Sequence, residues 1–176
     1  MRQSMSSYDY GKDKVLEWIH ENVPTDAEIL DVGSCDGKWR TMLQEYPNVD
    51  ACDIFAPNIE ATRTMYRESY CMDILEYKYK HYDLVIFGDI IEHMDVEGAQ
   101  AALKYAKAHS NAVIVSVPYR YPQGALYGNP WEAHVQDDLT ESIFEERYPG
   151  FKPLLIIPER YGHYIYIKPK RKTKRG

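Results

Sequence analysis

A buried apolar run that ends on an acid and continues into a tight turn is the segment that most constrains the fold. Residues 29–37 read Ile-Leu-Asp-Val-Gly-Ser-Cys-Asp-Gly. This pattern predicts a strand, a turn of small residues, and a helix that begins near Lys38. Such an arrangement brings backbone N–H groups and a helix N-terminus against a bound ligand. The segment therefore indicates a site for a nucleotide-like cofactor.

Apolar runs and amphipathic segments alternate along the chain, and this alternation predicts the fold class. The expected strands are 28–32, 49–54, 69–72, 82–87, 112–117, 152–157 and 163–167. The expected helices are 15–23, 38–46, 58–66, 96–108 and 139–148. Strands that alternate with helices imply βαβ units and a mainly parallel sheet that is covered on both faces. The last two strands are expected to be antiparallel, because only a short turn separates them.

The bulk composition predicts one soluble domain. The chain has 176 residues, of which 44% are hydrophobic and 27% are charged, and we assign residues 1–167 to this domain. No apolar run approaches the roughly 18 residues needed to span a membrane, and the polar N-terminus gives no secretory signal. Cys35, Cys52 and Cys71 form neither a disulfide framework nor a zinc spacing. We therefore expect a reducing, cytoplasmic location.

The net charge of −6 hides an asymmetry between the body of the chain and its C-terminus. Residues 168–176 carry six basic residues and no acid, which leaves 15 basic against 27 acidic residues in the rest. An acidic body repels phosphate backbones, which argues against a nucleic-acid substrate. We interpret the basic tail as a solvated terminus. An arm for nucleic acid or for a membrane surface is the alternative.

The spacing of the turn distinguishes between cofactor templates. The G-x-G-x-x-G template of dinucleotide-binding folds fails at two positions. A D-x-G-x-G-x-G template matches Asp31, Gly33 and Gly37, with Cys35 in place of the middle glycine. Here the chain resembles the class I S-adenosylmethionine-dependent methyltransferases, over about residues 26–120. The resemblance implies an α/β, Rossmann-like, doubly wound sheet of about seven strands, mostly parallel with an antiparallel last strand.

Acids follow at the ends of the next strands. Asp53 ends the second strand, 20 residues after Gly33, where a carboxylate accepts both ribose hydroxyls of an adenosine. The resemblance implies that Ile54 packs against the adenine, that Asp73 meets its amino group, and that Asp89 lies near the methionine moiety. It implies S-adenosylmethionine as cofactor and S-adenosylhomocysteine as product. The expected cofactor-binding residues are Asp31, Gly33, Ser34, Cys35, Gly37, Asp53, Ile54, Met72, Asp73, Gly88 and Asp89.

A second group of reactive side chains follows the fourth strand. Residues 89–94 read Asp-Ile-Ile-Glu-His-Met. If this segment is helical, Asp89, Glu92 and His93 lie on one face, because they are three and four positions apart. Residues 90–91 are then expected to turn toward the core.

Two histidines are the candidate bases. Methylation of a hydroxyl needs a group that removes its proton, and histidine does this near neutral pH. The segment at 90–94, the later His134 and the Gly-Phe pair at 150–151 resemble small-molecule methyltransferases of the ubiquinone-biosynthesis type. We therefore predict His93, His134 and Glu92 as catalytic residues. The predicted reaction is methyl transfer to oxygen or nitrogen of a small-molecule acceptor.

Two alternative functions stay open. The methyltransferases that modify the 2′-oxygen at the 3′ end of small RNAs resemble this segment, with a Glu-x-x-Glu-His pattern and a distant histidine that hold a divalent metal. Asp89, Glu92, His93 and His134 would then supply two carboxylates and two imidazoles. The shorter Asp89 and the acidic body argue against this, so no metal site is predicted. The other alternative is a non-catalytic S-adenosylmethionine-binding subunit.

The stretch 119–137 is irregular and rich in Tyr, Pro and Gly. Loops of this length within a domain are usually functional, and we interpret this one as a lid or acceptor-site loop. Its aromatic residues Tyr119, Tyr121, Tyr127 and Trp131 are expected to cover a bound acceptor and exclude water. The sequence leaves a homodimer open.

Overall fold

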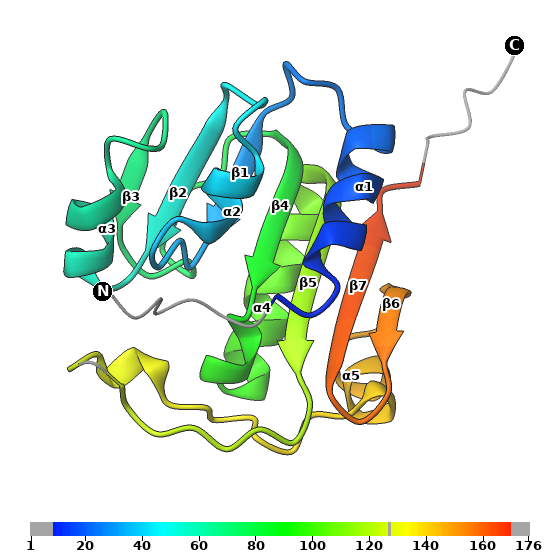
Figure 1. Cartoon of the computed structure of the whole chain (residues 1–176). Coiled ribbons are helices and arrows are strands. Elements are labelled where there is room, and N and C mark those ends of the chain that lie inside the picture. The colour runs from blue at the N-terminus through cyan, green and yellow to red at the C-terminus, as the bar shows by residue number, and fades with distance from the viewer. Residues whose placement is uncertain (1–8, 127, 170–176) are drawn as a thin grey trace, which may run out of the picture.

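A seven-stranded sheet forms the centre of the molecule (Figure 1). The structure is a computed structural model that describes residues 9–126 and 128–169. The strands are β1 (Ile29–Val32), β2 (Val49–Asp53), β3 (Ser69–Cys71), β4 (Tyr82–Gly88), β5 (Ser110–Pro118), β6 (Lys152–Ile157) and β7 (Tyr161–Ile167), in the order β3-β2-β1-β4-β5-β7-β6. Strand β7 runs antiparallel to β5 and β6, and the other neighbours are parallel. The predicted Rossmann-like sheet with an antiparallel last strand is confirmed.

Five α-helices and two short 3₁₀-helices accompany these strands in the described part of the chain. They are α1 (Lys12–Asn22), α2 (Lys38–Met42), α3 (Ala56–Thr62), η1 (Ile91–His93), α4 (Val96–Ala108), η2 (Pro130–Glu132) and α5 (Glu141–Arg147). Helix α4 and strand β6 have the predicted bounds. Helix α2 is shorter than the predicted 38–46, because the backbone leaves the helical conformation at Leu43, where ψ is 32°.

Each face of the sheet has its own core. In β4, Leu84 and Ile86 belong to the cluster that includes α1 and α2, whereas Val85 and Phe87 belong to the cluster of α4 and α5. Figure 1 shows α1 and α2 in front of the sheet, and α4 and α5 behind it. Successive side chains of a strand point to opposite faces, so a strand covered on both faces is apolar at nearly every position.

The carboxyl ends of β1, β2, β4 and β5 meet at one edge of the sheet, at the bottom of Figure 1. The loop between β5 and α5 runs along this edge. Ligands of open α/β sheets bind beyond the carboxyl ends of the strands. A ligand site is therefore expected at this edge, beside this loop.

No helix among the described residues is long and apolar enough to cross a bilayer. Cys35, Cys52 and Cys71 are free thiols. The predicted basic tail at 168–176 lies outside the described residues from position 170 onward.

Candidate active site

A cavity of about 590 Å³ lies at the carboxyl edge of the sheet. Its walls come from the segments after β1, β2, β3 and β4 and from the loop after β5. Twelve of the fourteen predicted site residues line it: Gly33, Ser34, Cys35, Asp53, Ile54, Met72, Asp73, Gly88, Asp89, Glu92, His93 and His134. The exceptions are Asp31 and Gly37.

The turn after β1 has the conformation that glycine favours. Gly33 and Gly37 have φ angles of 69° and 80°, and a Cβ on Gly33 would lie 1.7 Å from Cδ1 of Ile90. Cys35, in the place of the middle glycine, also has a positive φ of 45°, a conformation that costs a residue with a Cβ roughly 1–2 kcal/mol. Its amide donates to Oδ2 of Asp53 at 2.9 Å. Cys35 thus keeps the left-handed backbone of a glycine, and Asp53 holds it there.

Asp53, at the end of β2, joins three segments of the chain. Besides the amide of Cys35, its carboxylate accepts from the amide of Phe55 at 2.8 Å and from Nδ2 of Asn58 at 3.1 Å. These bonds connect the turn after β1 to the start of α3. Asp53 is buried and still borders the cavity. Asn58 was not predicted, because nothing in its own neighbourhood marks it as a partner of Asp53.

Asp31 is fully buried on β1 and does not line the cavity. The hydroxyl of Tyr66 donates to its Oδ2 at 2.6 Å, but burial outweighs this bond and raises the pKa of Asp31 to about 7. Oδ1 of Asp31 and Oγ of Ser34 have no hydrogen-bond partner within residues 9–126 and 128–169. Such unpaired buried atoms are rare in folded proteins, so this segment has unused hydrogen-bonding capacity.

A lysine of the N-terminal helix reaches Asp89. This aspartate follows β4 with a φ of 59°. It accepts from Nζ of Lys12 at 2.8 Å and from the hydroxyl of Tyr161. Lys12 is 1% exposed, and its ammonium lies 5.9 Å from the ring centroid of Trp39, within the range of a cation–π contact. Lys12 was missed by sequence reasoning because it is one polar residue of a helix, 77 positions before its partner.

Glu92, His93 and His134 meet in the cavity. The ligand atoms that they offer lie within 4.8 Å of one another, and the two imidazole rings are 4.7 Å apart at 80°. Nδ1 of His93 is 3.3 Å from the carbonyl oxygen of Ala133, and Nδ1 of His134 is 2.5 Å from that of Tyr121. A carbonyl oxygen only accepts, so each Nδ1 carries the proton and each Nε2 keeps its lone pair.

Burial disfavours the charged forms of Glu92, His93 and His134. Both carboxylate oxygens of Glu92 are buried without a partner among the described residues. Burial, and then the charge of Asp89, raises the pKa of Glu92 well above its usual range. Burial, and then His134, lowers the pKa of His93 to about 4, and burial also lowers the pKa of His134. At neutral pH both imidazoles are therefore uncharged and able to accept a proton or to bind a metal.

The backbone that carries this cluster differs from the predicted helix. Only Ile91–His93 is helical, as a 3₁₀ turn, and it follows the left-handed Asp89. Ile91 is in the core as predicted. Ile90 is half-buried: it packs against the same core cluster and also lines the cavity, and its side chain occupies the space that a Cβ of Gly33 would need.

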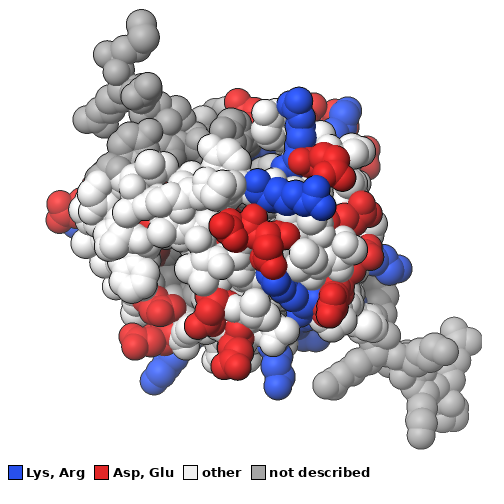
Figure 2. Space-filling view, turned by 90° about the horizontal axis from the view of Figure 1, so that it is seen from below, with Lys and Arg blue, Asp and Glu red and all other residues white. Residues whose placement is uncertain are grey.

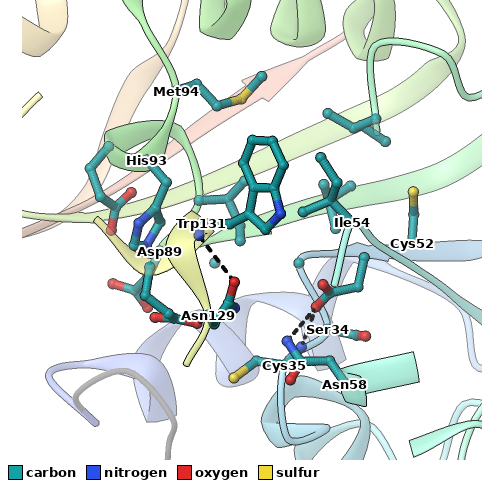
Figure 3. Close-up of a pocket in the computed structure, with 18 of the residues that line it drawn as sticks. Ser34, Cys35, Cys52, Ile54, Asn58, Asp89, His93, Met94, Asn129 and Trp131 are labelled. Atoms are coloured by element: carbon teal, nitrogen blue, oxygen red, sulfur yellow. Dashed lines mark hydrogen bonds between the residues drawn. The ribbon is translucent and has the colours of Figure 1, made fainter. Parts of the chain in front are cut away.

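The aromatic residues of the loop after β5 have different positions. Tyr121 and Trp131 line the cavity and are 37% and 55% exposed. In Figure 3, the indole of Trp131 stands between the two sides of the cavity. Tyr119 is instead buried, with its hydroxyl bonded to that of Tyr164, so it is not part of a cover. Tyr127 lies outside the described residues.

Neither a protein-family model nor a curated protein sequence matches the chain, but solved structures do. A S-adenosylmethionine-dependent methyltransferase from Clostridium acetobutylicum aligns with a TM-score of 0.71 at 13% identity, over 94% of both chains. The methyltransferase domain of bacterial CtHen1-C gives 0.66 at 19% identity, over 90% of this chain and 96% of that chain. The magnesium protoporphyrin IX methyltransferase ChlM from Synechocystis PCC 6803, with bound SAM, gives 0.65 at 15% identity, over 89% and 77%.

These likenesses define a class of fold. The three matched structures come from methyltransferases with different names and are each less than 20% identical to this chain. At that identity, the shared feature is the architecture of the domain. The chain therefore has the Rossmann-like fold of S-adenosylmethionine-dependent methyltransferases.

Proposed function

We propose that this chain is a methyltransferase that uses S-adenosylmethionine, releases S-adenosylhomocysteine, and acts on oxygen or nitrogen of a small molecule. One observation carries the proposal. A single cavity, at the edge of the sheet where this fold class binds ligands, gathers the glycine turn, the acidic strand ends and two uncharged imidazoles. The bound SAM of ChlM supports the choice of cofactor.

The residues of the cavity wall fit this cofactor. Gly33 and Ser34 line the cavity, and Oγ of Ser34 has no partner among the described residues. Asp53 presents a carboxylate, which suits two neighbouring hydroxyls of a ribose. We assign the adenine to Ile54 and the amino-acid end to Asp89. The remaining proposed contacts on the wall are Cys35, Met72, Asp73 and Gly88, whereas Asp31 and Gly37 do not line the cavity and are proposed to act from behind its wall.

The protein's own contribution is to hold the acceptor, exclude water and remove a proton. The cofactor, when bound, supplies an activated methyl group and a neutral leaving group. Nε2 of His93 or of His134 receives the proton of the acceptor, because both rings are neutral and both Nδ1 atoms face carbonyl oxygens. Glu92 lies beside both rings, and a positive charge that forms on either imidazole favours the ionised form of this carboxyl, which then stabilises the charge. Trp131 and Tyr121 shield the acceptor from water.

The charge of the lining favours an uncharged or cationic acceptor over nucleic acid. The described lining residues include seven acids and one lysine, Lys38, which pairs with Asp9 at 2.6 Å. Figure 2, which looks onto this edge, shows a broad area of uncharged side chains, with both acidic and basic side chains around it. A negative surface repels phosphate groups. The name of ChlM likewise gives a small molecule as its acceptor.

A second candidate is metal-assisted methylation of a hydroxyl, such as the RNA 2′-hydroxyl. The observation that favours it is the cluster of one carboxylate and two imidazoles within 4.8 Å. Neutral imidazoles suit Zn²⁺, Fe²⁺ or Co²⁺, and a carboxylate adds affinity for harder ions. A metal there would orient the hydroxyl and lower its pKa. Activity that EDTA abolishes and a divalent ion restores would favour this candidate, and activity that survives EDTA would contradict it.

Isothermal titration with S-adenosylhomocysteine tests the cofactor. We expect micromolar binding, which Asp53→Asn weakens by roughly tenfold or more because a charge-assisted hydrogen bond is lost. Asp26→Asn, at an exposed acid ahead of β1, is the matched control and is expected to bind like the parent. Circular dichroism confirms that Asp53→Asn folds. No binding by the parent, or equal binding by the folded variant, contradicts the proposal.

A labelled-methyl screen of amines and phenols then tests catalysis. A non-catalytic subunit would bind S-adenosylhomocysteine but would transfer no methyl group on its own. In a complex with a catalytic partner, methyl transfer would not depend on His93 or His134. The variants His93→Ala and His134→Ala would then leave the activity of such a complex intact. We further propose a cytoplasmic location, because three free thiols suit a reducing compartment.

A further inference from the structure

We infer that Gln136 is a positioning residue that fixes the turn of Glu92 and His93 against the loop of His134. The importance of Gln136 for catalysis rests on the proposed function, whereas its hydrogen bonds are independent of that function. Gln136 is 3% exposed and lies two positions after His134. It was not among the predicted site residues, and it does not line the cavity.

The amide nitrogen of Gln136 holds the turn at both ends. Nε2 donates to the carbonyl oxygen of Ile91 at 2.8 Å and to that of Met94 at 3.0 Å. Ile91 begins the 3₁₀ turn, and Met94 is the residue that follows it. Both N–H groups of one side chain are therefore used to bracket the two residues that carry the carboxylate and the imidazole.

The backbone beside Gln136 adds further bonds to the same turn. The amides of Val135 and Gln136 both donate to the carbonyl oxygen of Glu92, at 2.8 and 2.9 Å. Nδ1 of His93 faces the carbonyl oxygen of Ala133. The loop and the turn are thus joined as one unit, which sets the 4.7 Å separation of the rings of His93 and His134.

The amide oxygen of Gln136 anchors the joined loop and turn to the end of helix α5. Oε1 accepts from the hydroxyl of Tyr148 at 2.7 Å and from Nη1 of Arg147 at 3.1 Å. All four hydrogen-bonding positions of the side-chain amide are therefore occupied. Because an unpaired buried polar group is costly, each partner restricts the amide to this orientation.

The variant Gln136→Glu separates the two halves of this arrangement. A carboxylate keeps acceptor oxygens for Tyr148 and Arg147 but has no N–H for the turn. Gln100→Glu is the matched control, because Gln100 is an exposed residue that donates to the backbone oxygen of Arg147 and does not contact the turn.

Amide hydrogen exchange decides the inference. In Gln136→Glu, we expect the amides of residues 135 and 136 to exchange about tenfold faster or more, while β4 and β5 keep their protection. Binding of Zn²⁺, used as a probe of how the cluster is arranged, is expected to weaken about tenfold or more, with S-adenosylhomocysteine binding unchanged. Gln100→Glu is expected to match the parent in all three. Parent-like exchange at 135 and 136 in Gln136→Glu overturns the inference.

A second variant covers the case in which Gln136→Glu does not fold. Tyr148→Phe removes one donor to Oε1 and is expected to speed exchange of the same two amides by about threefold. Unchanged rates in that variant overturn the inference. A parent chain that binds no S-adenosylhomocysteine contradicts the proposed function alone, because the exchange comparison needs no cofactor.

Discussion

The ammonium of Lys12 and the carboxylate of Asp89 form an ion pair that is shielded from water, with 1% and 12% of the two side chains exposed. The pair ties the first turn of α1 to the end of β4. The same carboxylate accepts from the hydroxyl of Tyr161 on β7. Three segments of the chain thus meet at one negative charge of the cavity wall, and Lys12 balances that charge from outside the lining.

Lys12→Met is expected to destabilise the protein and to weaken cofactor binding. Removal of one partner leaves Asp89 as an uncompensated, largely buried charge, which typically costs ~3 kcal/mol. Urea unfolding measures the loss of stability, and titration with S-adenosylhomocysteine measures the change in affinity. Lys14→Met is the control, because Lys14 pairs with Glu17 on an exposed surface, where ion pairs contribute little to stability.

The double variant Lys12→Met/Asp89→Asn identifies the cause. If the unpaired charge is responsible, neutralising Asp89 recovers most of the stability that Lys12→Met loses. An equal loss in the single and double variants would show that Lys12 acts through packing of its aliphatic stem instead.

Cys35→Gly is expected to be tolerated, whereas Cys35→Val is not. The φ of 45° at Cys35 suits glycine, so the glycine variant relieves strain and offsets its own entropy cost, within about 1 kcal/mol of the parent. A β-branched residue fits this conformation badly, and Cys35→Val is expected to lose ~2 kcal/mol and cofactor affinity. Cys71→Val is the control, because Cys71 is exposed on strand β3. Equal stability of the two variants at position 35 would contradict the role assigned to this turn.

The sequence predicts the sheet well because its signals are local and strongly periodic. Helix α4 has the predicted bounds, since Asp95 caps its first turn by accepting from the amide of Gly98. The end of α2 is predicted too late, because apolar residues continue to Tyr46 although the helix ends at Met42. Local pattern does not record where tertiary packing stops a helix.

The same reasoning finds the acids and histidines of the site but not the residues that hold them. Asp53 ends a strand and His93 follows one, where chain order alone predicts a site. Lys12 and Gln136 contact those segments from 77 and 45 positions away along the chain. A single lysine on a helix or a single glutamine in a loop carries no signal of such contacts. Their contacts arise only when the chain folds and brings these distant segments together.

Asp31→Asn is expected to stabilise the protein at pH 8 and to weaken cofactor binding. Burial raises the pKa of Asp31 to about 7 in the folded state. The contribution of its protonation to the free energy of unfolding is therefore complete below the unfolded pKa near 3.8, and it is lost as the pH rises through 7. The amide variant avoids this loss, by on the order of 2 kcal/mol at pH 8. The gain is expected to shrink toward pH 5. Urea unfolding at both pH values checks this, and a gain that does not depend on pH would contradict it.

His93→Asn is expected to make the protein less sensitive to acid. The pKa of His93 is lowered to about 4 by burial and by His134, against about 6.5 in the unfolded chain. Between pH 6.5 and 4 the unfolded state takes up a proton that the folded state does not. The free energy of unfolding therefore decreases as the pH is lowered, by up to about 1.4 kcal/mol per pH unit. The asparagine variant lacks this term and keeps a donor for the carbonyl of Ala133. Urea unfolding of both proteins in EDTA, from pH 7.5 to 4.5, measures the two slopes. Parallel slopes would mean that His93 is not held neutral by burial, and His93 would then lose its place as the proposed base.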